Sequence, residues 1–264
     1  PIQDARIHYL NDRDVARGRY VLYWMQQSQR AEMNHALEYA VQEANRLNQG
    51  VVVVFGLTDE YPEANLRHYT FMLEGLRETA QALRKRDIRM VMRRGSPAAV
   101  ALELGREASL LVCDCGYLRH QRQWRQAVAR EAACRVVQVE SDLIVPVETA
   151  SNKAEIGART LRPKIHRRLP DYLKPLSPMA VGTPTGEFKL EGISVDNPAD
   201  LLQTLRIDRS VHPVSSRFRG GTSEAKRRFT EFLKNRLARY EKNHKQPQTD
   251  DISCMSPYLH FGQI

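Results

Sequence analysis

The chain has few cysteines and no long apolar run. Its 264 residues include four cysteines, which do not make a disulfide framework in a chain of this length. The longest apolar stretches, Tyr20–Met25 and Val51–Phe55, are far shorter than the roughly 20 residues of a membrane-spanning helix. Residues 1–19 are polar and carry both signs of charge, unlike a signal peptide. We therefore expect a cytoplasmic protein in a reducing compartment, without membrane association.

Several catalytic signatures are also missing. The turn Trp24–Ser28 contains no glycine, so the backbone is not expected to approach a pyrophosphate closely, as it does in NAD-type dehydrogenases. The sequence has no G-x-x-x-x-G-K-[ST] loop and no G-x-S-x-G elbow, which disfavours P-loop NTPases and α/β-hydrolases. The eight histidines are scattered, with no H-E-x-x-H pair.

The pair Cys113 and Cys115 could in principle hold a soft metal ion. No second pair stands at the spacing of a zinc site, so buried thiols are the better interpretation and we expect no metal. Asp114, between them, is placed at the carboxyl end of a predicted strand, where open α/β sheets bind ligands. It either lines a pocket or caps the following helix.

The first half of the chain alternates between strand-like and helix-like patterns. Five short β-rich runs are separated by amphipathic or Pro-initiated helical segments, which predicts a parallel, Rossmann-like five-stranded sheet covered on both faces. The predicted strands are Tyr20–Met25, Val51–Leu57, Ile88–Arg93, Leu110–Asp114 and Arg135–Val139. The helical segments lie at residues 33–47, 66–83, from 97 onward and 118–132.

We assign three regions along the chain. Residues 18–150 form the α/β domain, residues 151–221 form a connector rich in proline and glycine, and residues 222–264 begin a helical domain. Within the connector, the stretch Asn152–Leu169 reads as a helix interrupted at Pro163. A long amphipathic helix is expected from Thr222 to Tyr240.

The net charge of +9 is concentrated in two places. Residues 152–174 carry seven basic and two acidic side chains, and residues 222–245 carry eight and three. Each run alone is compatible with a solvated helix face. Two such runs beside a near-neutral domain indicate a polyanionic partner, plausibly nucleic acid.

The segment Ile252–Ser256 is a candidate anion site. Small hydroxyl residues lead into a helix that Ser256 is expected to cap, with Pro257 at its first position. Free backbone amides at such a point attract phosphate, although an ordinary helix cap explains the same residues. This last helix is predicted to run for about two turns without a capping glycine or a packing partner.

Motifs along nearly the whole chain resemble class II cyclobutane-pyrimidine-dimer photolyases of the photolyase/cryptochrome family. They occur in the family's order: Tyr23–Met25, Gln29-Arg30, Asn34 with Ala36-Leu37, Val53–Glu60, Tyr69–Leu76, Thr160–Lys164 and Ser256–Ile264. Ser28 stands where the family commonly has an aspartate, and Cys254 where a polar residue is typical. Because family members continue well beyond this point, we expect the chain to be the N-terminal part of a longer protein.

The resemblance implies a light-driven DNA repair enzyme, a deoxyribodipyrimidine photo-lyase. The α/β domain would hold an antenna pigment such as a deazaflavin, and the helical domain would bind FAD. Tyr240 would pack near the flavin, while its phosphates and ribityl chain would be held by Ile252, Ser253, Cys254, Met255 and Ser256. Photoexcited reduced FAD would give one electron to a flipped-out pyrimidine dimer in UV-damaged DNA, the ring would open, and the electron would return.

The catalytic residues of such an enzyme are expected outside this chain, which alone would be inactive. The protein is expected to be a monomer. Two alternatives remain: a cryptochrome-like blue-light sensor on the same scaffold, and a non-enzymatic α/β module that binds a pigment or nucleotide.

Overall fold

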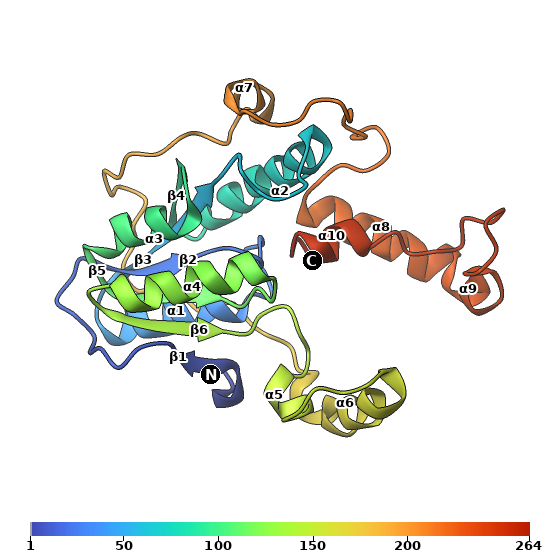
Figure 1. Cartoon of the computed structure of the whole chain (residues 1–264), viewed down its shortest axis with the longest axis horizontal. Coiled ribbons are helices and arrows are strands. Elements are labelled where there is room, and N and C mark those ends of the chain that lie inside the picture. Colours follow the sequence, from blue (N-terminus) through green and yellow to red (C-terminus); the bar gives the residue numbers. More distant parts are fainter. Residues whose placement is uncertain (1) are drawn as a thin grey trace. The chain divides into compact units, whose positions relative to one another are not determined.

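The computed structural model describes residues 2–264 and divides into two compact units. The first unit comprises the residues up to Thr58 together with Leu83–Ile193, and the second comprises Asp59–Ala82 with Ser194–Ile264. Figure 1 shows the sheet of the first unit and the helices of the second.

The first unit is built on a six-stranded sheet in the order β1-β6-β5-β2-β3-β4. All neighbouring strands are parallel except β1, which pairs antiparallel with β6 at the edge. The five predicted strands are confirmed, and β1 is an addition. The strands are β1 (Ile7–Tyr9), β2 (Tyr20–Trp24), β3 (Gly50–Leu57), β4 (Arg89–Arg94), β5 (Ala108–Asp114) and β6 (Arg135–Val139).

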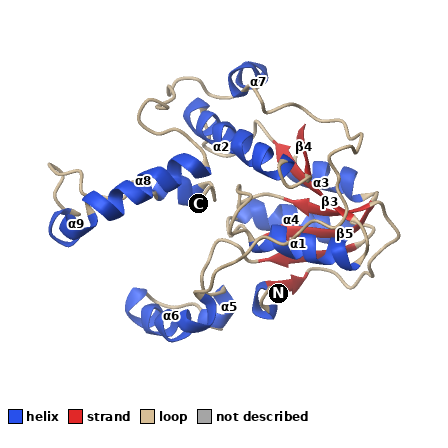
Figure 2. Cartoon of the chain, turned by 180° about the vertical axis from the view of Figure 1, so that it is seen from behind, coloured by secondary structure: helices blue, strands red, loops and turns tan. Residues whose placement is uncertain are grey.

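Helices cover both faces of this sheet, as Figure 2 shows. Alternate residues of a strand point to opposite faces, so Tyr20, Leu22 and Trp24 of β2 pack with α3 (Pro97–Gly105) and α4 (Arg119–Glu131) in one core. The intervening Tyr23 faces α1 (His35–Arg46), where its hydroxyl contacts the Asn34 side chain. All residues of β2, β3 and β5 are buried, which explains their continuous apolar sequences.

The chain order of the strands places a topological switch point at the centre of the sheet. From β2 the chain moves outward through β3 and β4, and it then returns to pair β5 on the other side of β2. Crossovers that leave in opposite directions open a crevice at the carboxyl ends of β2 and β5. Trp24 and Asp114 are the final residues of these two strands.

Two helices follow the sheet. The short α5 (Val147–Ala150) contacts α6 (Ala158–Tyr172), which runs without a break through Pro163 and Pro170. The predicted interruption at Pro163 is therefore wrong. A proline removes one intrahelical hydrogen bond, and on this solvent-exposed helix water can bind the freed carbonyl group.

Part of the expected connector returns to the first unit. The Thr185 hydroxyl donates to the carbonyl oxygen of Val51 at 2.6 Å and accepts from the Arg89 amide at 2.8 Å. Phe188 packs against Tyr20, with ring centroids 6.3 Å apart. This segment therefore contributes to the core, although it forms no strand of the sheet.

The second unit is helical. It contains most of α2 (Leu66–Arg84) and four later helices: α7 (Pro198–Thr204), α8 (Thr222–Asn235), α9 (Leu237–Asn243) and α10 (Ser256–His260). The single helix expected from Thr222 to Tyr240 is broken at Arg236, whose backbone leaves the helical region at φ −125°. The apolar stripe of the sequence thus continues across two helices.

The last helix, α10, has both a capping glycine and a packing partner, which corrects two expectations. Gly262 adopts φ +61°, its amide donates to Leu259 O, and the Gln263 amide donates to Tyr258 O at 2.8 Å. This pattern is a Schellman cap. Tyr258 is fully buried against Phe71 of α2, with ring centroids 5.0 Å apart.

Candidate functional site

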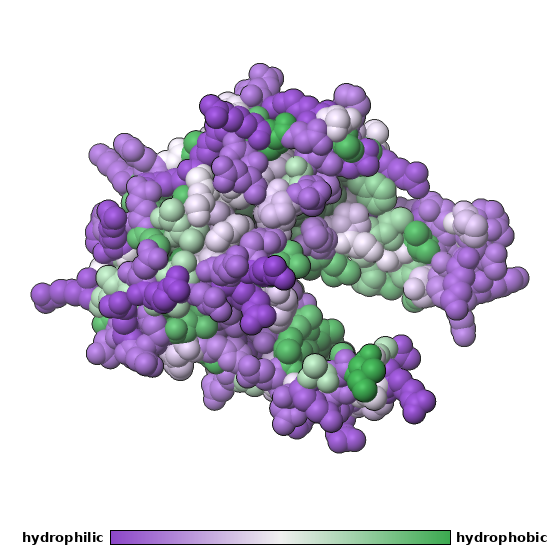
Figure 3. All heavy atoms as spheres, in the orientation of Figure 1, coloured by the Kyte–Doolittle hydropathy of each residue, from purple (hydrophilic) through white to green (hydrophobic). Residues whose placement is uncertain are grey.

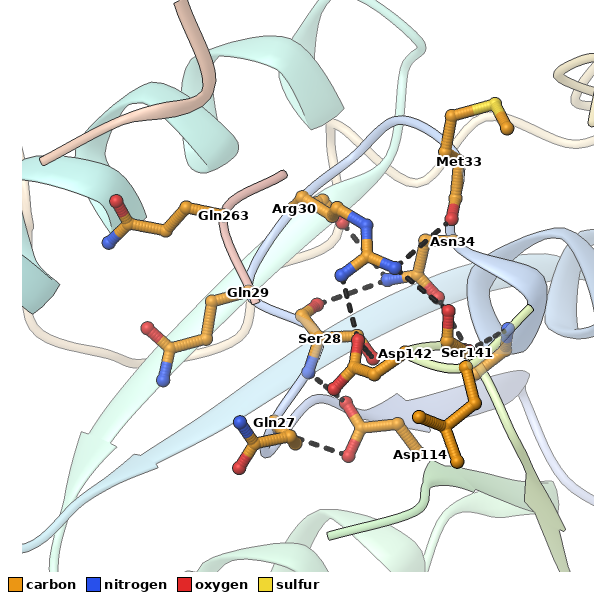
Figure 4. Close-up of polar contacts among 12 residues, drawn as sticks. Gln27, Ser28, Gln29, Arg30, Met33, Asn34, Asp114, Ser141, Asp142 and Gln263 are labelled. Atoms are coloured by element: carbon orange, nitrogen blue, oxygen red, sulfur yellow. Dashed lines mark hydrogen bonds and ion pairs between the residues drawn. The ribbon is translucent and has the colours of Figure 1, made fainter. Parts of the chain in front are cut away.

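The first candidate site is the loop at the carboxyl ends of β2 and β5. The Asp114 carboxylate accepts hydrogen bonds from the backbone amides of Gln26, Gln27 and Ser28 at 3.0–3.1 Å. The hydroxyl of Tyr23 donates to the same group at 3.0 Å. Figure 4 shows Asp114 below this loop. Asp114 is fully buried, so it neither caps α4 nor offers its oxygen atoms to a ligand.

This arrangement explains why the first turn lacks glycine. The three loop amides that could face a phosphate are already paired with a carboxylate from the neighbouring strand. A dinucleotide pyrophosphate could not accept hydrogen bonds from these amides, because they already donate to the Asp114 carboxylate. Burial raises the pKa of the Asp114 carboxyl, the nearby Asp142 adds to the rise, and the three amides oppose it.

A second carboxylate, Asp142, holds the next part of the loop. Arg30 forms an ion pair with Asp142 at 2.8 Å and also donates to the carbonyl oxygen of Ser141 at 2.9 Å. The Ser28 hydroxyl donates to the same Asp142 oxygen at 2.8 Å. Asn34 then caps α1, since its side-chain oxygen accepts from the Leu37 amide at 3.0 Å.

Polar atoms near this loop lack partners among residues 2–264. Both ends of the Gln26 side-chain amide and the Nδ1 atom of His35 are buried without a hydrogen bond. Burial, followed by the charges of Arg6 and Arg30, lowers the pKa of His35 to about 4. Unpaired buried polar groups cost free energy, and these atoms have no exposed surface in the structure.

The two cysteines beside Asp114 are buried, as the sequence suggested. Burial raises the pKa of both thiols, to about 11 for Cys115. Within the described chain, no three histidine, cysteine or acidic side chains are grouped as a metal site would require.

The second candidate site lies in the second unit and includes part of the predicted cofactor segment. A pocket of about 270 Å³ is lined by Ile252, Ser253 and Cys254 together with residues of α8 and of the loop that precedes it. Met255 instead packs in an apolar cluster with Phe71, and Ser256 begins α10. The structure therefore brings only three of the six predicted residues to this pocket.

Tyr240 lies on α9 and is not among the residues that line the pocket. Its ring stacks on His244 with centroids 4.9 Å apart and meets Phe232, which does line the pocket, edge-on at 5.7 Å. The side chain remains 40% exposed. Tyr240 is thus linked to the pocket through one aromatic neighbour.

Ser256 does not cap α10 as expected. The first helical bond runs from the Leu259 amide to the carbonyl oxygen of Met255, so Met255 is the residue before the helix and Ser256 is the first helical residue. No side chain caps this end. Cys254 makes the preceding turn at φ +56°, a left-handed conformation that few non-glycine residues adopt.

Charged residues of the pocket were not singled out from the sequence. Arg228 pairs with Glu224 at 2.7 Å, and Arg236 pairs with Glu231 at 2.9 Å and with Asp250 at 3.4 Å. The Arg228 guanidinium also lies over the Phe218 ring at 4.9 Å. The basic run of residues 222–245 was the available signal, but it did not show which arginines face inward.

Comparisons with known proteins show similarity over the whole chain. Residues 21–181 match the family model described as DNA photolyase. A deoxyribodipyrimidine photo-lyase of Methanothermobacter thermautotrophicus is 43% identical over 265 aligned residues, covering 100% of this chain and 58% of that protein. A protein of the same name from Potorous tridactylus is 34% identical over 92% of this chain and 46% of its own length. The chain thus spans about half the length of these relatives.

Cryptochromes match over much less of the chain. Cryptochrome-1 of Sinapis alba is 29% identical over 34% of this chain. Among solved structures, a class III photolyase from Agrobacterium tumefaciens has a TM-score of 0.71 and 18% identity, covering 94% of this chain and 52% of that one. This likeness supports the fold. Across residues 2–264, no helix has the length and apolar character needed to cross a membrane.

Proposed function

The chain belongs to the DNA photolyase family, and from this premise we propose that it is the N-terminal part of a light-driven repair enzyme that splits cyclobutane pyrimidine dimers. The observation that carries the proposal is the 43% identity to a deoxyribodipyrimidine photo-lyase along the entire chain. We assign it to class II because of the ordered motifs from Tyr23–Met25 to Ser256–Ile264.

The proposal assigns a role to each region. Residues 18–150 form an antenna domain, residues 151–221 a connector, and residues 222–264 the beginning of the FAD-binding domain. UV-damaged DNA is the partner, and the protein acts as a cytoplasmic monomer. The four free cysteines are compatible with a reducing compartment.

The pocket in the second unit fits one end of FAD. When bound, the reduced and photoexcited flavin supplies the electron that opens the dimer. Three arginines and two acidic residues line the pocket, so its lining keeps a net positive charge, which suits the phosphate end of the cofactor; they are Arg217, Arg228, Arg236, Glu231 and Asp250. A volume of about 270 Å³ cannot enclose the whole molecule. Tyr240, Met255 and Ser256 adjoin this pocket in sequence or packing, and their contact with FAD remains part of the proposal.

The loop after β2 is the proposed edge of an antenna pigment site. Because Asp114 occupies the loop amides, a pigment must bind through other groups. Once side-chain movement exposes them, the unpaired Gln26 amide and His35 Nδ1 would offer hydrogen bonds to a heterocycle such as a deazaflavin. A neutral His35 can accept or donate there.

The function can be tested by photoreactivation. This chain would be joined to the remainder of the Methanothermobacter relative and expressed in UV-irradiated bacteria that lack both excision repair and their own photolyase. We expect blue light to raise survival well above that of cells kept in darkness. A chimera that binds and photoreduces flavin without raising survival would instead favour a cryptochrome-like sensor.

A further inference from the structure

We infer that the outward face of α6, formed by Arg159, Arg162, His166 and Arg167, is a binding surface for the phosphate backbone of nucleic acid. The inference deepens the proposed function, because it locates one contact surface for the DNA partner. This surface is separate from the pocket proposed for FAD, because α6 belongs to the first unit and the pocket to the second.

The helix separates its charges from its apolar residues. Positions 159, 162, 166 and 167 lie on one side of a helix with 3.6 residues per turn, and all four side chains are exposed. A separate, narrower stripe of the helix holds half-buried Leu161, Ile165, Leu169 and Tyr172. Figure 3 shows hydrophilic residues along the outer edge of α6. On the apolar stripe, Tyr172 contacts Thr149 of α5, whereas the arginines are exposed.

The arginines of this face have no acidic partners within the described residues. The nearby Glu155 forms an ion pair with Lys164. The only acidic residue of α6 itself is Asp171, in the last turn. The second basic run behaves differently: its arginines are paired locally, as in Arg227 with Glu224 and Arg239 with Asp251. Of the two basic runs, α6 thus offers the guanidinium groups that can bind an external anion without first breaking an ion pair.

The N-terminal segment anchors this helix. The side-chain amide of Gln3 donates to the carbonyl oxygen of Asp171 at 3.0 Å, and the guanidinium of the buried Arg6 lies over the Tyr172 ring at 5.6 Å. The hydroxyl groups of Thr149 and Tyr172 are 3.4 Å apart. An anchored helix presents its charges in a fixed array, which lowers the conformational entropy lost on binding.

The dimensions suit a nucleic-acid strand. Arg159 and Arg167 are eight residues apart, or about 12 Å along a helix. One strand of a duplex places a phosphate about every 3.4 Å of axis, so the array spans about three phosphates. A membrane surface fits less well. A helix that lies on a membrane inserts an exposed apolar face, but the apolar stripe of α6 is half-buried. Its basic face contains Pro163 and Pro170 between the charged residues.

The test is the salt dependence of DNA binding by the 264-residue chain in darkness. A fluorescein-labelled undamaged duplex would be titrated by anisotropy between about 50 and 200 mM salt. We expect R159Q/R162Q/R167Q to lower the slope of log K against log salt by about 1 per side chain. The unaltered chain would then lose about 60-fold more affinity than the variant over this range.

Two further variants serve as controls. R119Q/R122Q/R130Q removes the same charge from exposed positions of α4 and should keep the slope of the unaltered chain. R159K/R162K/R167K keeps the charge on α6 and should also keep it. Circular dichroism and thermal unfolding of each variant establish that the fold is retained.

Other results would overturn the inference. It is wrong if the unaltered chain does not bind the duplex at low salt, if the α4 variant loses as much slope as the α6 variant, or if anionic vesicles bind the arginine face and DNA does not. The proposed function is tested separately by light-dependent survival, which does not depend on this slope. Survival without an α6 effect leaves the function standing and removes only this surface.

Discussion

At the scale of single residues, Asp114 fixes the loop that follows β2. Its carboxylate joins β5 to the loop after β2 through three backbone amides and the Tyr23 hydroxyl. The sequence could place Asp114 at the end of a strand, but its partners are 86–91 residues away, and no local pattern reveals such pairs. Its actual role, filling the position where a phosphate could bind, therefore required the structure.

We predict that Asp114→Asn destabilises the protein by about 1–3 kcal/mol. The asparagine side chain keeps the shape but turns an NH₂ group toward at least one backbone amide, which leaves donors facing each other. Urea unfolding at neutral pH measures the change. Asp12→Asn at an exposed position should stay within about 0.5 kcal/mol of the unaltered chain. Equal stability of the Asp114 and Asp12 variants would contradict the described network.

His35 should make the stability depend on pH. The pKa of His35 is about 4 in the folded chain, because burial and then the charges of Arg6 and Arg30 disfavour its protonation, against about 6.5 when unfolded. The contribution of neutral His35 to folding stability is fully present above pH 6.5. As the pH falls from 6.5 toward 4, the unfolded chain binds the proton first, and stability is lost.

The measurement is the urea midpoint at pH 7 and pH 5 for His35→Gln and the unaltered chain. We expect the variant to lose less stability between these two pH values. His212→Gln, at an exposed position, should show the same loss as the unaltered chain. An unchanged pH dependence in His35→Gln would show that this histidine is not held neutral by its surroundings.

At the scale of secondary structure, continuous apolar runs and helical periodicity predicted the five parallel strands and the four helices between them. They did so because these segments are buried on the faces that the patterns mark. Strand β1 was missed because it has three residues, none of them buried, and exists only by pairing with β6. The cap of α10 was not predicted although Gly262 is visible in the sequence, because a helix of about two turns from Ser256 would run past this glycine.

We predict that Gly262→Ala destabilises the second unit by about 1 kcal/mol, because a side chain is strained at φ +61°. The loss should appear as faster proteolysis of residues 194–264 under native conditions. Gly186→Ala is the matched control, since a Cβ atom there meets nothing within 4 Å and its backbone φ is not in the left-handed region. Equal cleavage of both variants would contradict the Schellman cap.

The cofactor segment shows the limit of sequence reasoning at this scale. Ile252, Ser253 and Cys254 were expected at a binding site, and they do line a pocket. Arg217 and Arg236 line it as well, but they come from a loop and a helix boundary without a spacing rule. At the break between α8 and α9, Arg236 pairs with Glu231 of α8 and with Asp250 from the following loop.

At the scale of the whole molecule, the proposed sites lie in two different compact units. The first holds the sheet, the loop fixed by Asp114 and the arginine face of α6. The second holds the pocket proposed for one end of FAD. The chain spans 58% of the length of the Methanothermobacter relative, so light-driven repair by this protein is a proposal that needs its own test.

The most direct test of that claim is dimer repair in solution. This chain, joined to the remainder of the Methanothermobacter relative, would be supplied with reduced FAD and a thymine-dimer oligonucleotide, with the intact relative as reference. We predict that the dimer disappears under blue light and persists in darkness. Persistence in light under conditions where the relative repairs it, or equal loss in darkness, would contradict the account.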